Sequence, residues 1–208
     1  MNKIPWTGIL VSIQPRIRLT RSFDQRSHSY LGYCLVLDGL IDNEQREFSV
    51  AIGKAVHQKH QFRVGDEISG LSVRVPDARL EATEFYKVSK LQLLKRSEEV
   101  IGTCPPFQDV PPELQVYRKR GHRRLAMRTY ENQCRSCMWG CLMPVEIIVD
   151  HWNPGRKKYR FETFCYGPKS CWKYRAGAKR NVLGRKGMSY TEEDWVDDEA
   201  VSHRGEDE

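Results

Sequence analysis

Five cysteines lie between residues 134 and 171, and their spacing constrains the fold of this chain more than any other feature. The first three follow the pattern C-x2-C-x3-C, and five residues separate the last two. Two thiolates at the x2 spacing can reach a single ion from one turn. A strand-like hairpin, "PVEIIVDHW" and "KKYRFETF" joined by "NPGRK", brings the second group back beside the first. We therefore predict one shared site, whose ligands are Cys134, Cys137, Cys165 and Cys171.

The remaining composition favours a metal over disulfides. Seven cysteines is an odd number, and the N-terminal residues lack the apolar stretch of a signal peptide. No run approaches the roughly 18–20 uncharged apolar residues of a membrane span. We expect a cytoplasmic protein in a reducing environment, with no membrane partner, where clustered cysteines hold metal.

Two cysteine turns at the base of a β-hairpin resemble a zinc ribbon. The resemblance implies a closed, tetrahedral, structural Zn²⁺ ion. This sequence departs from the pattern in its long second turn and in the extra thiol of Cys141. Three cysteines at x2 and x3 spacing with a distant fourth could instead ligate a [4Fe–4S] cluster, with Cys141 as an alternative ligand. Buried, reduced cysteines without metal are the third possibility.

Residues 4–95 have the pattern of five β-strands. Apolar and β-branched residues alternate in "TGILVSIQPRIRL", which we expect to bend at its proline, and in "REFSVAIG". The run "SYLGYCLVLDGLI" contains Gly32, where we expect a bulge. The segments "GDEISGLSVRV" and "TEFYKVSKLQLL" complete the set. A short helix is predicted within "KAVHQKHQFRVGD", between the third and fourth strands.

This order is similar to the OB-fold, a five-stranded barrel that binds oligonucleotides. The residues that carry the resemblance are the long first strand over 7–19, Gly32 in the second, and "FRVGDEISG" at 62–70. The resemblance covers about ninety residues and implies that single strands cross the second and third strands. The fold class we expect is mainly β, an N-terminal OB-like barrel plus a C-terminal zinc-ribbon-like hairpin module.

Composition shifts divide the chain into four parts. Residues 1–96 form the expected barrel, and 97–130 form a linker with two Pro-Pro pairs and a basic segment. Within that linker a helix is predicted from Pro112 to Gly121. Residues 131–186 form the cysteine-rich module, and 187–208 an acidic tail that we expect to be flexible.

Charge is distributed unevenly along the chain. From Lys186 to Glu208 there are nine acidic and two basic residues, whereas residues 1–185 hold 32 basic and 18 acidic ones. A basic body indicates a polyanionic partner, most often nucleic acid, although a solvated surface gives the same count. The candidate nucleic-acid-binding residues are Arg16, Arg18, Arg21, Arg26, Tyr33, Arg118, Lys119, Arg120, Arg123, Arg124, Lys173, Arg175, Lys179 and Arg180.

We therefore expect a non-catalytic nucleic-acid-binding protein that favours single-stranded DNA or RNA. No spaced set of acid, base and nucleophile is present, and an ion held by four cysteines has no open position for water. Two alternatives stay open. One is an interaction subunit that docks on a protein partner in a nucleic-acid-processing complex, and the other is an iron–sulfur enzyme or redox sensor.

Overall fold

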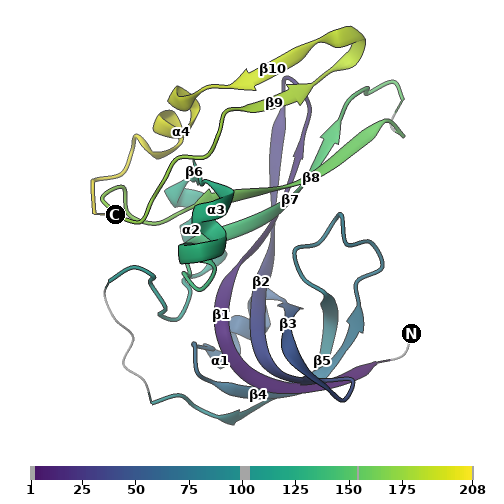
Figure 1. Cartoon of the computed structure of the whole chain (residues 1–208), viewed down its shortest axis with the longest axis vertical. Helices are drawn as coiled ribbons and strands as arrows, with labels where there is room; N and C mark the ends of the chain where they lie inside the picture. The colour runs from purple at the N-terminus through teal and green to yellow at the C-terminus, as the bar shows by residue number, and fades with distance from the viewer. Residues whose placement is uncertain (1–2, 99–103, 154, 208) are drawn as a thin grey trace.

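The computed structural model describes residues 3–98, 104–153 and 155–207 (Figure 1). The strands are β1 (Ile4–Arg21), β2 (Arg26–Ile41), β3 (Glu44–Ile52), β4 (Glu67–Arg74), β5 (Phe85–Lys95), β6 (Arg123–Arg124), β7 (Gly140–Ile148), β8 (Lys157–Cys165), β9 (Arg180–Leu183) and β10 (Ser189–Glu192). The helices are α1 (Lys54–His60), α2 (Leu114–Arg120), the single turn α3 (Met127–Thr129) and α4 (Asp194–Val201). A π-helical turn covers Tyr130–Cys134, and a 3-10 turn covers Arg185–Gly187.

The fold is mainly β, as the sequence predicts, with 46% strand against 17% helix. Eight strands form one sheet in the order β2-β3-β5-β4-β1-β7-β8-β6, and β9 and β10 form a separate hairpin. Among the described residues, no helix combines the length and the apolar character needed to cross a membrane.

Strand β1 organises the molecule, because it runs almost its whole length (Figure 1). It pairs with β4 only up to Ile9 and with β7 only from Leu19. Pro15 lies between these segments, where β1 pairs with β2 alone among the described strands. Proline has no backbone N–H, and at this position no described strand on the other side of β1 needs one. Pro15, where the sequence predicts a bend, thus lies in the stretch over which β1 changes partners.

The bulge expected at Gly32 is confirmed. The β1–β2 register shifts opposite this residue, whose φ is 141°. A Cβ atom here would lie 2.0 Å from the carbonyl oxygen of Ile52, so only glycine fits.

The first five strands pair in the sequence β1–β2–β3–β5–β4 and return to β1. The β3–β5 step is parallel and rests on the pair Val50–Phe85. Helix α1 lies between β3 and β4 in the chain, as the sequence predicts. Side chains from all five strands fill one core; examples are Trp6, Leu35, Val50, Ile68 and Phe85.

The C-terminal hairpin extends this sheet. Strand β7 runs parallel to the end of β1, pairing Leu19 with Val145, and β8 follows antiparallel. Met143, Val145 and Phe164 belong to the same buried cluster as Ile17. Sheet and core therefore continue across the boundary that the sequence suggests at residue 131.

The basic segment before the cysteines is also packed. Helix α2 buries Leu114 and Tyr117 against the core and ends at Gly121, as predicted. Gly121 has φ 68°, and a Cβ atom there would lie 2.1 Å from the carbonyl oxygen of Ala200. This glycine therefore ends the helix, and its lack of a side chain lets the backbone of α4 approach closely.

The acidic segment differs from the flexible tail that the sequence suggests. Residues 189–201 form β10 and α4, and Val196 and Val201 are buried. Asp197 accepts hydrogen bonds from the backbone and the guanidinium of Arg124, at 3.0 and 2.8 Å. The segment is held by partners more than sixty residues away, which local composition does not reveal.

Candidate metal centre and basic surface

The four cysteines predicted as ligands line one small cavity of about 10 Å³. Cys134, Cys137 and Cys165 are buried, and Cys171 is half-buried. Phe107, Trp139 and Tyr174 pack around them and separate the thiols from solvent. The structure thus brings together the two cysteine groups that the sequence separates by the hairpin.

The local fold explains this meeting. Cys134 ends the π-helical turn, and the carbonyl of Cys134 accepts a hydrogen bond from the N–H of Cys137 at 3.1 Å. The N–H of Gly140 then donates to the carbonyl of Cys137 at 3.0 Å and starts β7. Gly140 is paired with Cys165 on β8, so the hairpin returns the chain to the first turn, as predicted.

Backbone amides point at two of the sulfurs. The N–H of Gly167 lies 3.4 Å from Cys165 Sγ, and a backbone hydrogen bond from Trp139 lowers the pKa of Cys137. Burial outweighs this effect and raises the pKa of Cys137 to about 11. Burial and the other three thiols raise the pKa of Cys134 to about 12. The thiols of Cys134 and Cys137 therefore keep their protons near neutral pH unless a cation displaces them.

Gln14 on β1 anchors the first cysteine turn. Its buried Nε2 donates to the carbonyls of Cys134 and Cys137 at 2.9 and 2.8 Å. The hydroxyl of Tyr130 donates to Gln14 Oε1 at 2.7 Å, so both ends of the amide are used. The sequence does not single out Gln14, because a glutamine within a strand gives no signal of a partner 120 residues away.

Cys141 lies apart from the cavity. Its thiol donates to the carbonyl of Pro15 at 3.3 Å, and it packs in the main core. The other four thiols share a cavity without standing in coordinating positions: within the described residues, no group of three or more His, Cys, Asp or Glu side chains is arranged to hold a metal ion.

The candidate arginines on β1 and β2 are engaged internally. Arg16 and Arg18 both contact the Glu81 carboxylate at 2.7 Å. Arg21 is buried, and it and Arg26 each lie 3.4 Å from Glu192. Four of the candidate phosphate contacts therefore already have carboxylate partners.

The candidates around α2 divide into stacked, exposed and buried side chains. The guanidinium of Arg118 lies 4.9 Å from the ring centre of Tyr30, and that of Arg120 lies 4.4 Å from Trp139. Lys119 is exposed. Arg123 is buried, 3.9 Å from the Tyr174 ring, and Arg124 is buried and pairs with the buried Asp197 and the exposed Asp194.

The remaining candidates lie between residues 173 and 180, and only some of them pair with carboxylates. Lys173 lies 5.2 Å from the exposed ring of Trp172, and Arg175 donates to backbone carbonyls in the same turn. Lys179 pairs with Glu193, and Arg180 pairs with Glu162 at 2.8 Å. The candidate residues thus spread over several surfaces.

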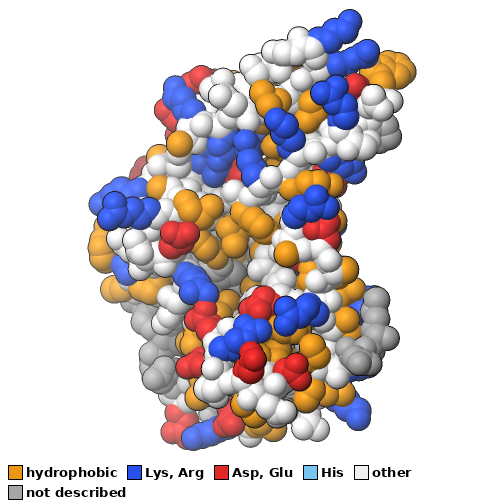
Figure 2. All heavy atoms as spheres, turned by 45° about the vertical axis from the view of Figure 1, so that its right-hand side comes forward, with side chains coloured by type: hydrophobic (Ala, Val, Ile, Leu, Met, Phe, Trp, Pro, Cys, Tyr) orange, Lys and Arg blue, Asp and Glu red, His pale blue; other side chains and the backbone are white. Residues whose placement is uncertain are grey.

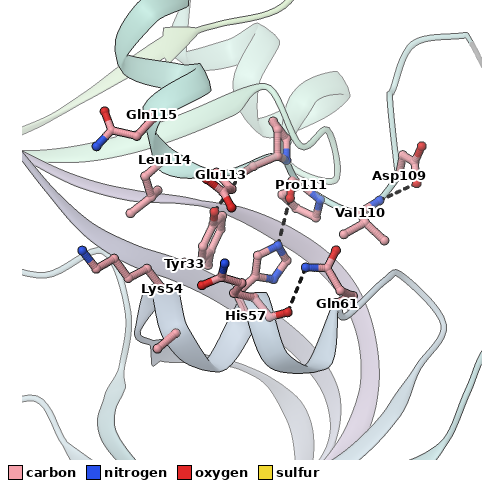
Figure 3. Close-up of a pocket in the computed structure, with 13 residues that line it drawn as sticks. Tyr33, Lys54, His57, Gln61, Asp109, Val110, Pro111, Glu113, Leu114 and Gln115 are labelled. Carbon is pink, nitrogen blue, oxygen red and sulfur yellow. Dashed lines mark hydrogen bonds between the residues drawn. The ribbon is translucent and has the colours of Figure 1, made fainter.

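Tyr33 is buried and presents no ring face to solvent. Its hydroxyl donates to the carbonyl of Pro112 at 2.7 Å, and its ring centre lies 4.0 Å from that of His57 (Figure 3). His57 in turn donates to the carbonyl of Pro111 at 2.9 Å, since a carbonyl can only accept. These bonds tie residues 109–115 to β2 and α1 and border an open pocket of about 650 Å³.

Two histidines pack beside the buried ion pairs. The ring centres of His28 and His122 lie 4.8 Å apart. Burial lowers the pKa of His28 to about 4, helped by Arg26 and Arg21 and opposed by Glu192. Burial also lowers the pKa of His122 well below its ordinary value. Both rings are therefore neutral in the folded protein near pH 7.

This pair makes stability pH-dependent. In the unfolded chain His28 takes up a proton near its ordinary pKa of 6.5, but in the folded protein it does so only near 4. The contribution of the neutral His28 to the free energy of unfolding is thus fully present above about pH 6.5. It is lost as pH falls toward 4, and the total loss is roughly 3 kcal/mol. Urea unfolding at about pH 7 and about pH 4.5 measures the loss. His28→Gln should reduce the pH dependence, whereas His151→Gln, on the exposed turn, should not. An identical pH dependence in His28→Gln contradicts a neutral His28.

The chain matches no family model, no curated protein and no solved structure. Its function must therefore be inferred from the arrangement of strands, thiols and charges alone.

Proposed function

We propose that this protein binds single-stranded nucleic acid without catalysis, through an OB-like barrel fused to a structural metal centre. The observation that carries the proposal is the pairing order β1–β2–β3–β5–β4, returning to β1, with α1 between β3 and β4. A five-stranded Greek-key barrel has this order, and such barrels bind oligonucleotides. The function itself is inferred by analogy with that fold.

The metal of the proposal is Zn²⁺, held by Cys134, Cys137, Cys165 and Cys171. Burial, an all-sulfur donor set and amide groups aimed at two sulfurs suit a tetrathiolate site. The thiols would have to rotate to close around the ion. The position of Cys141 in the main core favours this set over the alternative [4Fe–4S] ligation that uses Cys141.

The proposed role of the ion is structural. When bound, zinc supplies a crosslink between the first cysteine turn, the end of β8 and the turn at Cys171. Four thiolates leave no open position for water or substrate. The chain's own residues hold the turns in place, with Gln14 orienting the first of them.

The charge distribution supports a polyanionic ligand. The net charge is +7 even with the acidic C-terminal segment included. That segment neutralises buried arginines such as Arg124, and exposed cations remain elsewhere. Such a surface attracts phosphate backbones at long range.

Fluorescence anisotropy with labelled single-stranded DNA, single-stranded RNA and duplex DNA of equal length tests the proposal. At about 50 mM salt we expect at least one single strand to bind about tenfold or more tightly than the duplex. Equal binding of all three probes would contradict single-strand preference. No binding at low salt would contradict the proposed function and favour a protein partner as the ligand of the basic surface.

A further inference from the structure

One group of exposed cations lies on the turns at one end of the molecule, and it is not among the candidate residues that the sequence suggests. Arg156, Lys158 and Lys186 are exposed and have no carboxylate partner in the described part of the chain. Figure 2 shows Lys and Arg side chains gathered over this upper end, with few acidic ones among them.

Two turns from different hairpins form this surface. The β7–β8 turn carries Arg156 and leads into Lys158, and the β9–β10 turn carries Arg185 and Lys186. Arg185 Nε lies 3.9 Å from Asp150 Oδ2, which joins the turns. Figure 1 shows both turns projecting on the same side of the upper end.

Neighbouring bonds keep the two hairpins together. Arg160 of β8 donates to the carbonyl of Asn181 on β9 at 2.9 Å. Behind the second turn, a Cβ atom at Gly184 would lie 3.0 Å from the ring of Phe23, so that ring packs closely on the turn. The surface is therefore supported by the β1–β2 hairpin.

An aromatic ring is carried by the same β7–β8 turn as Arg156. Trp152 is 84% exposed, more than any other large hydrophobic side chain in the described residues. Its backbone N–H donates to Asp150 Oδ1 at 3.1 Å, which fixes the start of the turn without covering the ring. The exposed face of the indole is therefore open to stacking by a planar group such as a base.

We propose that this surface, the cationic tip formed by Trp152, Arg156, Lys158, Arg185 and Lys186, is a contact site for single-stranded nucleic acid. The inference rests on the proposed function and adds to the barrel a second contact for the same ligand. Phosphates pair with the cations, and one base stacks on the indole, because single strands expose base faces that a duplex buries.

The carboxylates near the tip leave an excess of positive charge. Glu146 is engaged by Lys157 at 3.1 Å, and Asp150 is buried below the turn. Neither neutralises the three unpaired cations. A phosphate backbone matches this excess, and the single exposed ring suits one base.

Two variants with matched controls test the site. Arg156→Gln, Lys158→Gln and Lys186→Gln are combined, and the control combines Lys54→Gln, Lys59→Gln and Lys95→Gln, which are equally exposed on α1 and β5. Trp152→Ala is compared with Trp195→Ala, an exposed tryptophan on the acidic helix α4. Binding is measured by anisotropy with the single-stranded probe that the unaltered protein prefers.

We expect the triple tip variant to bind at least about tenfold more weakly, with the salt slope reduced by about 2 for three lost contacts. Trp152→Ala should weaken binding about tenfold. Both controls should bind like the unaltered protein. If the unaltered protein binds and the tip variants bind equally well, the tip assignment is wrong but the proposed function stands.

A membrane is the competing ligand for a tryptophan among cations. Vesicles of phosphatidylcholine with phosphatidylserine therefore form a second arm. Loss of vesicle binding in the tip variants, with nucleic-acid binding unchanged, overturns the assignment. Absence of nucleic-acid binding by the unaltered protein overturns the proposed function together with the inference.

Discussion

Cys165→Ser is expected to abolish stoichiometric zinc and leave the C-terminal half sensitive to protease. Structural zinc contributes about 10–16 kcal/mol of apparent binding free energy in small zinc modules, so loss of one thiolate removes much of the stabilisation. Cys165 is buried, lines the cavity that the four thiols share, and ends β8. Metal analysis of the purified protein and limited proteolysis measure the two effects.

Cys104→Ser is the matched control for this change. Cys104 is exposed and does not line the cavity, so zinc content and proteolysis should not change. Zinc at one ion per chain in both variants would show that Cys165 is not a ligand. Iron and acid-labile sulfide in place of zinc would favour the cluster interpretation.

Arg124→Met is expected to lower the free energy of unfolding by about 3–5 kcal/mol. The guanidinium is 1% exposed and contacts Asp194 and Asp197 at 2.6 and 2.8 Å. Methionine fills the space of the stem but leaves Asp197 without its cation in a largely buried position, which is the costly case. Urea denaturation measures the change.

Two further variants show whether the buried pair is the cause. Lys179→Met breaks the exposed pair with Glu193 in the same region and should cost no more than about 1 kcal/mol. Adding Asp197→Asn to Arg124→Met should recover part of the loss, because the unpaired charge is removed. Equal destabilisation by Arg124→Met and Lys179→Met contradicts this account.

The sequence was sufficient to predict the features that depend on local pattern. Alternation indicated the five N-terminal strands, and Gly32 marked the bulge because only glycine fits beside the carbonyl of Ile52. The Pro-Gly turn predicted the β7–β8 hairpin and the meeting of the cysteine groups. Each of these signals involves residues close together in the chain.

The features that the sequence did not predict depend on distant partners. The parallel pairing of β1 with β7 joins residues more than 120 positions apart, so the cysteine-rich part appeared to be a separate module. Arg124 looked like a surface cation, yet its partners lie about seventy positions further along. The hydrogen bond from Gln14 to the cysteine turn was not predicted for the same reason, because its partner lies 120 positions away in the chain.

A salt titration of single-strand binding tests the central claim most directly. The account predicts that log Kobs falls linearly with log salt, by about 0.7 for each phosphate contacted, and that the slope corresponds to several contacts. A slope near zero, or no measurable binding at about 50 mM salt, would contradict a nucleic-acid-binding protein.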